Sequence, residues 1–435
     1  MANLRPFSAV RYPRRPDLDL SSVISPPFDV IDEALRAKLQ ARHPHNIVHI
    51  DLPHIPPKAA GPDELYQKSS EMLRQWLDQG VLVRDGRPAL YPYMQTYEHD
   101  GKTYRRRGFF ALVKIAPFGE GDVVPHEKTY RGAIEDRLKL MHATGMQLSP
   151  IFGLYDDPRN QVSDLLYQNL LRPEQSATID GIRNDLWSVI DADTENAVID
   201  AIGTRSIYIA DGHHRYTTAL QYKADLEKQN GGPLPEAHPA NWCMFVLISM
   251  QDDGLLILPT HRLIGNLRHF DIDIFRATVS EHFDVAETPL TPQHVDEYAR
   301  DVLPKQPPHT FGLYCARTRK LYQLRLRDVD ILEKLEPNQS QAWRRLDVAI
   351  LQRYLLDEVI QPRFAGSQEI TKGYTADPNA IVPLTDGHRY DIALIIQSTP
   401  LQSLVELGRH NEVMPQKSTF FYPKLMTGMV INPLR

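Results

Sequence analysis

The sequence predicts an α/β fold of the mixed α+β kind, with a mixed central sheet covered by helices. Three observations support this fold class. An apolar strand at 206–209 leads through Asp211-Gly212 into a helical pattern that continues to residue 229. Two nearly continuous apolar stretches within 243–263 are typical of strands that are buried on both faces. A third pattern, at 60–82, has the apolar face of a helix that packs on a sheet.

The first two elements along the chain are a helix and a β-hairpin. In the segment 60–82, Leu65, Leu73 and Trp76 with Leu77 fall on one helical face, and Gly80 is typical of a helix end. Residues 89–115 form two apolar stretches on either side of Asp100-Gly101, a dipeptide that favours a tight hairpin turn.

The middle of the chain contains the strand–turn–helix pattern of 205–229. Its helical stripe contains Tyr216, Ala219, Leu220 and Ala224, and Gly231-Gly232-Pro233 ends it. The next segment, 243–263, is expected to form a second hairpin that turns at Asp252-Asp253-Gly254.

The last third continues the mixture of strands and helices. We expect a hairpin at 310–326, a helix at about 346–359, a strand at 390–396 and a short helix at 400–408. This pattern suggests three regions: an N-terminal α+β region at 1–115, a core at 116–270 and a C-terminal α/β region at 271–435.

Composition restricts the class of protein. The net charge of −6 argues against a nucleic-acid surface, and no apolar stretch approaches the roughly 20 residues of a membrane helix. Cys243 and Cys315 lie in apolar stretches and have no Cys-x-x-Cys spacing, so we expect reduced core residues. The first residues lack the pattern of a signal peptide, which predicts a cytoplasmic protein. A homodimer is compatible with the sequence.

The sharpest chemical signal is the segment from Ile207 to Tyr216. A strand that turns at Gly212 into a helix brings backbone N–H groups and the positive end of the helix dipole to one point. His213, His214 and Arg215 follow at once, and all three can donate to phosphate oxygens. Three such groups at a helix start oppose the dipole unless an anion is bound. We therefore predict a phosphate site at Asp211 to Arg215; the alternative is a helix that Asp211 caps and whose first turn is solvated.

A second cluster is Val124-Pro-His126-Glu127-Lys128-Thr129-Tyr130, which is dense in groups that perform acid–base chemistry. Glu127 is the candidate general base, and His126 a second candidate catalytic group. The alternative is a set of ordinary surface side chains. Arg137, in the helical pattern that follows, is a candidate substrate contact.

Three weaker candidates complete the set. His261 and Arg262 end an apolar stretch, where α/β folds often place functional groups. Lys417, Ser418 and Thr419, in the segment Pro415–Lys424, offer a phosphate or nucleotide contact, although an ordinary amphipathic strand fits as well. Asp29, after Pro26-Pro27-Phe28, is a candidate for orienting a substrate. We assign no metal ligand, and the sequence contains no P-loop, nucleophile elbow, Gly-x-Gly-x-x-Gly or His-Glu-x-x-His.

The chain resembles a prokaryotic protein family known as domain of unknown function 1015. The resemblance lies in six segments that span nearly the whole chain: Ser25–Ile31, Val124–Thr129, Leu148–Tyr155, Ala210–Tyr216, Leu258–Arg262 and Pro415–Lys424. The strand–Asp-Gly-His-His-Arg–helix segment is also similar to the phosphate-binding turn of the ParB/sulfiredoxin superfamily. That superfamily includes sulfiredoxins, a partition protein that hydrolyses CTP, and kinases of free serine.

Departures from that superfamily narrow the expected function. Sulfiredoxin needs a Cys in the turn, where this chain has His213, and the partition proteins carry a DNA-binding surface that this acidic chain lacks. The resemblance then implies a nucleotide-dependent phosphotransferase that acts on a small hydroxylated metabolite, with free serine as the best guess and Mg²⁺ bound with a nucleoside phosphate.

In this scheme the turn Gly212 to Arg215 holds the phosphates, Arg215 stabilises developing charge and Glu127 accepts the proton of the acceptor hydroxyl. His213 is a further candidate catalytic group. Lys128, Arg137, Arg262 and Lys417 are secondary phosphate or carboxylate contacts. Two alternatives stay open: a sensor that binds a nucleotide or metabolite without turnover, and a metal-dependent phosphohydrolase with His126, His213 and His214 as ligands.

Overall fold

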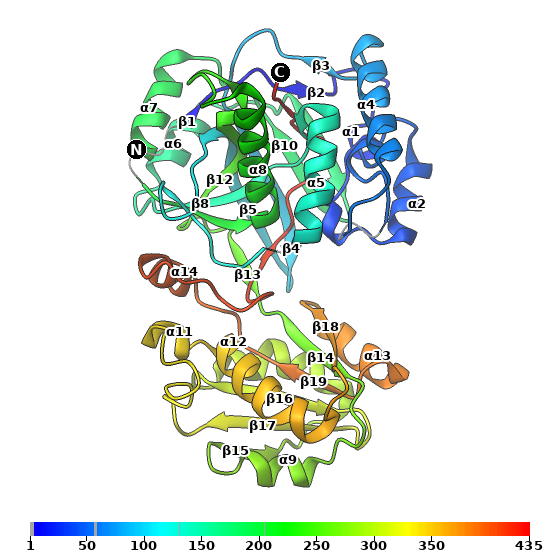
Figure 1. Ribbon diagram of the computed structural model, residues 1–435, viewed down its shortest axis with the longest axis vertical. Coiled ribbons are helices and arrows are strands. Elements are labelled where there is room, and N and C mark those ends of the chain that lie inside the picture. The colour runs from blue at the N-terminus through cyan, green and yellow to red at the C-terminus, as the bar shows by residue number, and fades with distance from the viewer. Residues whose placement is uncertain (1–3, 56–58, 130, 204) are drawn as a thin grey trace. The chain divides into compact units, whose positions relative to one another are not determined.

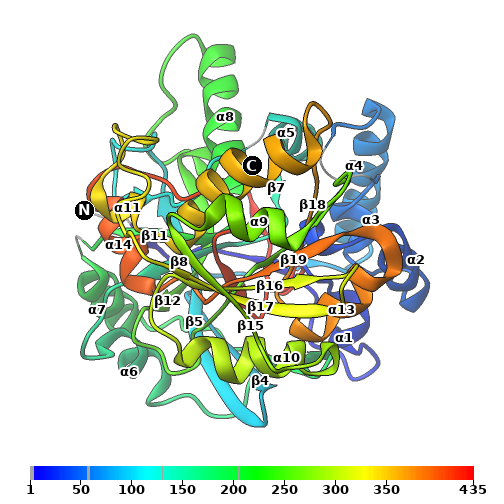
Figure 2. The same ribbon diagram turned by 90° about the horizontal axis from the view of Figure 1, so that it is seen from below.

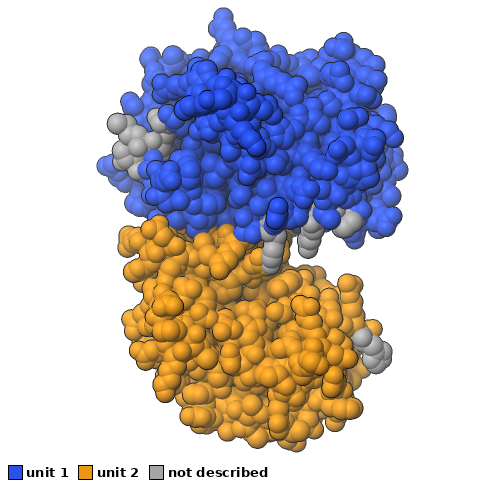
Figure 3. All heavy atoms as spheres, in the orientation of Figure 1, with its two compact units in different colours: residues 1–125, 129–256, 423–435 blue, residues 126–128, 257–422 orange. Residues whose placement is uncertain are grey.

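The computed structural model describes residues 4–55, 59–129, 131–203 and 205–435. The chain forms two compact units (Figure 3). The first comprises 1–125, 129–256 and 423–435, and the second comprises 126–128 and 257–422. The division into three regions near 116 and 270 stays a prediction.

The first unit is built on a mixed sheet, which has nine strands in the described part of the chain. The strand order is β6-β11-β8-β12-β5-β4-β10-β9, and β1 pairs with β5. The pairs β11–β6 and β12–β8 are parallel and the others antiparallel. The strands are β1 Leu4–Arg5, β4 Tyr91–His99, β5 Lys102–Lys114, β6 Val123–Val124, β8 Ile151–Tyr155, β9 Gln175–Ile179, β10 Ile182–Leu186, β11 Ile207–Asp211 and β12 Trp242–Ser249.

Helices cover this sheet (Figures 1 and 2). They are α1 Leu20–Val23, α2 Glu33–Arg42, α3 Val48–Asp51, α4 Asp63–Asp78, α5 Arg131–Thr144, α6 Gln161–Tyr167, α7 Ala192–Ile202 and α8 His213–Asn230. Helix α5 packs between α4 and α8. Two short strand pairs, β2 Val10–Arg11 with β3 Val83–Arg84 and β7 Met146–Gln147 with β21 Asn432–Pro433, complete the unit.

One apolar cluster joins the central strands to α6, α7 and α8. It includes Val162 of α6, Val198 of α7, Tyr216 of α8 and Phe245 of β12, each 0% exposed. Because β12 lies between β8 and β5, both of its edges are paired. The predicted class, a mixed sheet covered by helices, is confirmed.

The second unit contains an antiparallel sheet with the strand order β15-β17-β16-β19-β14-β18. The strands are β14 His261–Gly265, β15 Phe283–Glu287, β16 Thr310–Cys315, β17 Lys320–Leu326, β18 Thr371–Thr375 and β19 Ile392–Ile395. The helices are α9 Ile272–Val279, α10 Val295–Glu297, α11 Gln341–Arg344, α12 Asp347–Ala349, α13 Ile381–Leu384 and α14 Leu401–Arg409, and α12 continues as a π-type helix over Ile350–Ala365.

Most of the predicted elements are confirmed. The helix in 60–82 is α4, with Leu73 and Trp76 buried and Leu65 and Leu77 only partly so. The hairpin in 89–115 is β4–β5, and its turn residues Asp100 and Gly101 have φ of 47° and 71°. In the last third the hairpin β16–β17, the helix that begins with α12, the strand β19 and the helix α14 all form where expected.

The second predicted hairpin, at 243–263, is wrong. Its first arm, β12, pairs with β5 and β8, and β14 belongs to the sheet of the second unit. Between them, β13 (Leu256–Leu258) pairs with β20 (Phe420–Tyr422). The turn at Asp252 and Gly254 is held on the first sheet instead, by Arg107 at 3.1 Å and by the Tyr97 hydroxyl at 2.8 Å. A continuous apolar stretch indicates a buried strand but does not indicate which strand it pairs with.

Candidate functional site: the turn before helix α8 and a Glu127 cluster

The strand–turn–helix segment of the first unit forms as the sequence predicts. Ile207 and Ile209 of β11 are buried, and the strand ends in a register shift between Ile209 and Asp211. Gly212 then takes φ 96°, in the region that glycine adopts without steric cost. Helix α8 follows for 18 residues and ends at Gly231, whose φ is 72°. The glycines therefore set both ends of the helix.

Helix α8 begins at an electropositive point. Its first intrahelical hydrogen bond runs from the Tyr216 N–H to the Gly212 carbonyl at 3.0 Å. The preceding N–H groups, at positions 213–215, are oriented toward the N-terminal end of the helix, where the helix dipole is positive. This geometry suits an anion.

The Asp211 carboxylate, which caps the helix in the alternative interpretation, forms ion pairs with two cations. The Arg215 Nη2 lies 2.7 Å from its Oδ2 and the Lys424 Nζ lies 3.0 Å from its Oδ1. The three side chains are only 9–17% exposed. This turn therefore brings two cations and a carboxylate together.

Arg215 is held by the turn itself. Besides Asp211, its guanidinium donates to the Pro150 carbonyl oxygen. It also lies against Gly212: a Cβ at position 212 would be 3.0 Å from the Arg215 Cζ and Nε. Arg215 therefore links β11, the helix start and the segment before β8, and it positions the N–H groups as much as it supplies charge.

The histidines of the turn differ in exposure. His213 is buried, with 6% of its surface exposed, whereas His214 is partly exposed. The His214 carbonyl accepts a hydrogen bond from the Thr218 hydroxyl at 2.7 Å. Of the two, His214 is the better placed to meet a ligand from solvent.

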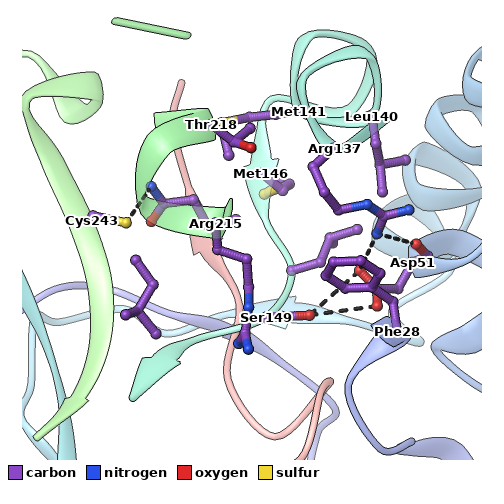
Figure 4. A pocket seen from close by; sticks show the side chains of 13 residues that line it. Phe28, Asp51, Arg137, Leu140, Met141, Met146, Ser149, Arg215, Thr218 and Cys243 are labelled. Atoms are coloured by element: carbon purple, nitrogen blue, oxygen red, sulfur yellow. Dashed lines mark hydrogen bonds and ion pairs between the residues drawn. The ribbon is translucent and has the colours of Figure 1, made fainter. Parts of the chain in front are cut away.

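A small cavity of about 40 Å³ lies beside this turn (Figure 4). Phe28, Asp51, Arg137, Ser149 and Arg215 are among the residues that line it. By the criterion that one water needs about 10–15 Å³ of such space, it holds a few waters and is too small for a nucleotide. Burial raises the pKa of Asp51 above its usual value, although Arg137 and Arg215 oppose this shift.

The guanidinium of Arg137 contacts several protein groups. Its Nε donates to Asp136 at 2.7 Å and its Nη1 to the Asp51 carbonyl at 2.6 Å, and its guanidinium lies 4.2 Å from the centre of the Phe28 ring. A direct substrate contact would require Arg137 to exchange these partners, so its role as a substrate residue stays a prediction.

In the second unit, two of the predicted segments lie together. The His126 Nε2 is 3.0 Å from the Thr419 hydroxyl, and the His126 carbonyl accepts from the Met414 N–H at 2.8 Å. Glu127 is partly exposed, and its Oε1 lies 3.9 Å from the His126 Nε2. This Glu127 cluster (His126, Glu127 and Thr419) pairs a carboxylate with an imidazole and a hydroxyl, which are groups that can move a proton.

Arg262 and His261 lie at the start of β14 and are buried. The Arg262 guanidinium donates to the carbonyls of Thr260 and Gln416 and faces the Tyr374 ring at 5.1 Å. Burial lowers the pKa of Arg262 to about 10 and that of His261 to about 3, so His261 is neutral at physiological pH. Glu127 is one of the groups whose charge favours the protonated form of Arg262.

The other predicted residues are Asp29, in the short 3-10 helix Phe28–Val30, and residues of loops. Asp29, Lys128 and Lys417 are exposed, and Tyr130 lies outside the described residues. The Ser418 hydroxyl donates to the Pro415 carbonyl and stabilises the turn that contains Lys417, whose φ is 58°. The predicted functions of these residues stay predictions.

The family is decided by comparison with known proteins. A family described as "Protein of unknown function (DUF1015)" matches residues 4–349. The chain belongs to the DUF1015 family. This confirms the resemblance drawn from the six sequence segments. A search of curated proteins found no match.

Three solved structures show how far the similarity of this DUF1015 protein extends. A free serine kinase variant in complex with AMP is 12% identical, covers 71% of this chain and 89% of its own, and has a TM-score of 0.34. The complex of such a kinase with ADP has the same identity and coverage and a TM-score of 0.33. A truncated SbnI from Staphylococcus aureus is 11% identical, covers 75% and 87%, and has a TM-score of 0.35. These proteins are ParB/sulfiredoxin-like, and at such scores they carry no functional argument.

Neither a metal-binding cluster nor a membrane-spanning helix is found among the described residues. No group of three or more His, Cys, Asp or Glu side chains is arranged to hold a metal ion. Within the same ranges, no helix has both the length and the apolar character needed to span a membrane.

Sequence reasoning missed the position of Lys424. It lies 213 residues from Asp211 along the chain, yet the two form an ion pair. Its only signal was membership of the segment Pro415–Lys424. Asp51 and Ser149, which line the cavity beside the turn, were also missed. Ser149 lies within the family segment Leu148–Tyr155, whereas Asp51 gave no signal.

Proposed function

We propose that this DUF1015 protein is a nucleotide-dependent phosphotransferase that acts on a small hydroxylated metabolite, with free serine as the first acceptor to test. One observation carries the proposal. The start of α8 combines a glycine at φ 96° with Arg215 and Lys424, two cations that pair with the Asp211 carboxylate.

The turn would hold phosphate oxygens through the backbone N–H groups of positions 213–215. A phosphate there would accept from these N–H groups at the positive end of the helix dipole and would be attracted by Arg215 and Lys424. The similarity of Ile207–Tyr216 to the phosphate-binding turn of the ParB/sulfiredoxin superfamily supports the same assignment. Arg215 would keep the turn in shape, and Lys424 and His214 would contact the phosphate.

Phosphoryl transfer also needs a group that accepts the proton of the acceptor hydroxyl. Glu127 is our candidate, because it is partly exposed and lies next to the imidazole of His126. We propose that Glu127 accepts this proton from an acceptor whose phosphate donor is held by the turn, and the rate of product formation tests this role. Lys128, Arg262, Lys417 and Thr419 are proposed secondary contacts.

Mg²⁺ is expected to accompany the nucleotide, where it would neutralise phosphate charge. A magnesium ion of this kind usually needs only one or two protein carboxylates beside the phosphates. Asp211 is the carboxylate of the turn, and its oxygens are paired with Arg215 and Lys424. It would hold the ion only if it exchanged one of these cations.

The direct test is product formation. The full chain is incubated with Mg²⁺, with ATP, ADP or CTP, and with serine, threonine or homoserine, and phosphorylated products are sought by mass spectrometry. We expect one nucleotide and one acceptor to give product, and Glu127→Gln to abolish it while nucleotide binding persists. Nucleotide binding without any product would favour a sensor, and neither binding nor product would contradict the proposal.

A further inference from the structure

The second unit contains a much larger cavity at one edge of its sheet. Its volume is about 560 Å³, within the range of about 300–1,000 Å³ that is typical of small-molecule sites. None of the segments that resemble the family contributes to its lining. It is therefore a separate feature of the chain, and it does not depend on the proposed phosphotransferase activity.

The position of this cavity follows from the strand order. Strands β14 and β16 lie on either side of β19 and are antiparallel to it, so their carboxyl ends reach the same edge of the sheet. The cavity is lined by the loops that follow β14 and β16 and by the segment that precedes β19. The carboxyl ends of strands are a common place for ligands in α/β proteins.

The acidic groups of the cavity already have partners. Asp386 is 3.2 Å from the Arg319 Nη2 and accepts a hydrogen bond from the Tyr314 hydroxyl at 2.7 Å. Asp391 accepts from the Leu267 N–H at 2.9 Å. Asp386 therefore compensates Arg319, and Asp391 holds the loop that follows β14.

Two further arginines of the lining form no ion pair with a carboxylate among the described residues. Arg268 donates to the neutral side-chain oxygen of Gln368 at 3.3 Å. Arg317 is exposed. With three arginines and two aspartates the lining is positively charged, in a chain whose net charge is −6. Guanidinium groups bind phosphate oxygens in a bidentate manner.

The lining also contains less polar residues. Phe270 and Tyr390, which are 6% and 7% exposed, line the cavity together with Cys315 and Ala316. These residues offer contacts to an uncharged ring, whereas Arg268 and Arg317 suit an anionic group. We propose that this cavity, the Arg268–Arg317 site, binds a phosphorylated small molecule of mononucleotide size, with its phosphate at the two arginines.

The test measures AMP binding by titration calorimetry. It is done with the full chain carrying Gly212→Ala, which should weaken binding at the turn of the first unit about 10–100-fold, and repeated with Lys424→Met, which should weaken it about tenfold. We expect one AMP per chain to bind with the same affinity in both backgrounds. The added pair Arg268→Ala and Arg317→Ala should weaken this binding at least tenfold. Arg363→Ala, which removes another exposed arginine of the second unit, should leave it unchanged.

Three results would overturn the assignment. The first is the absence of AMP binding in both backgrounds. The second is equal AMP affinity in the double arginine variant and in Arg363→Ala. The third is recognition that does not depend on the phosphate. We expect adenosine to bind at least tenfold more weakly than AMP, and malonate to compete with AMP less well than inorganic phosphate does. Equal binding of adenosine and AMP, or equal competition by malonate and phosphate, would show that the phosphate is not what the site recognises.

Discussion

Substitution of Gly212 by alanine separates the binding role of the turn from its structural role. At φ 96° an alanine lies beyond the left-handed region that side chains tolerate, so about 2–3 kcal/mol of strain is expected. Its Cβ would also lie 3.0 Å from the Arg215 Cζ, which must shift by a few tenths of an ångström. That shift moves Arg215 away from Asp211 and tilts the N–H groups of the helix start.

The effect on binding can be worked out from the hydrogen bonds at risk. A hydrogen bond to a charged group contributes about 1.5–3 kcal/mol. Misalignment of one such bond therefore weakens nucleotide affinity by about 10–100-fold, since 1.4 kcal/mol corresponds to a factor of ten. Loss of stability alone does not produce this effect, because a domain that starts at about 5–15 kcal/mol stays folded.

The matched control is Gly231→Ala at the other end of the same helix. Gly231 has φ 72°, and a Cβ there would meet no atom within 4 Å. We expect a cost of about 1–2 kcal/mol from the backbone and no change in nucleotide affinity. Denaturant unfolding gives the two stabilities, and titration calorimetry with ADP gives the two affinities. The reasoning is refuted if Gly212→Ala binds ADP as the wild type does, or if Gly231→Ala loses as much affinity.

Four further results are expected. Lys424→Met should weaken ADP binding about tenfold and flatten its salt dependence, because a cation of the turn is removed; unchanged calorimetric titrations at low and high salt would exclude this role. Glu127→Gln should abolish product formation and preserve ADP affinity, whereas Glu120→Gln, at an exposed acidic residue, should change neither in the same assays. Burial lowers the pKa of His261 to about 3, so between pH 6 and 3 the unfolded chain takes up a proton there and the folded chain does not. The free energy of unfolding should therefore fall by up to about 1.4 kcal/mol per pH unit in this range and be unaffected by His261 above about pH 6.5. In urea unfolding, His261→Asn should show a smaller fall of this free energy with pH, and an unchanged fall would contradict the reasoning. Burial raises the pKa of the Cys243 thiol to about 12, so iodoacetamide should modify it only after unfolding, as mass spectrometry of native and denatured samples can show.

Local signals made much of the fold predictable. Asp100-Gly101 and the strands around it define the β4–β5 hairpin, since a turn of that type demands positive φ at both positions. Gly212 and Gly231 bound α8 for the same reason, because both take positive φ. The false hairpin at 243–263 arose where the deciding information is distant: β12 is buried whatever its partner, and its pairing with β8 and β5 depends on the whole sheet.

The candidate site shows the same limit. The donors of the turn are consecutive residues, so Gly212 and the groups that follow it could be read directly from the sequence. The pairing of Lys424 with Asp211 spans 213 residues, and the contact of His126 with Thr419 spans 293. Such contacts are products of the folded chain, and no spacing rule reaches them. The sequence therefore suggested a chemistry for each segment, which stays a prediction, but not which segments share a cluster.

The most direct measurement is a crystal structure of the full chain grown with ADP and Mg²⁺. We predict that the terminal phosphate lies at the start of α8, with oxygens within about 3 Å of the backbone nitrogens of positions 213–215, and that Lys424 is close to it. A structure in which ADP binds elsewhere and the Gly212–Arg215 turn stays without a phosphate, at nucleotide concentrations that saturate binding in solution, would contradict the central claim.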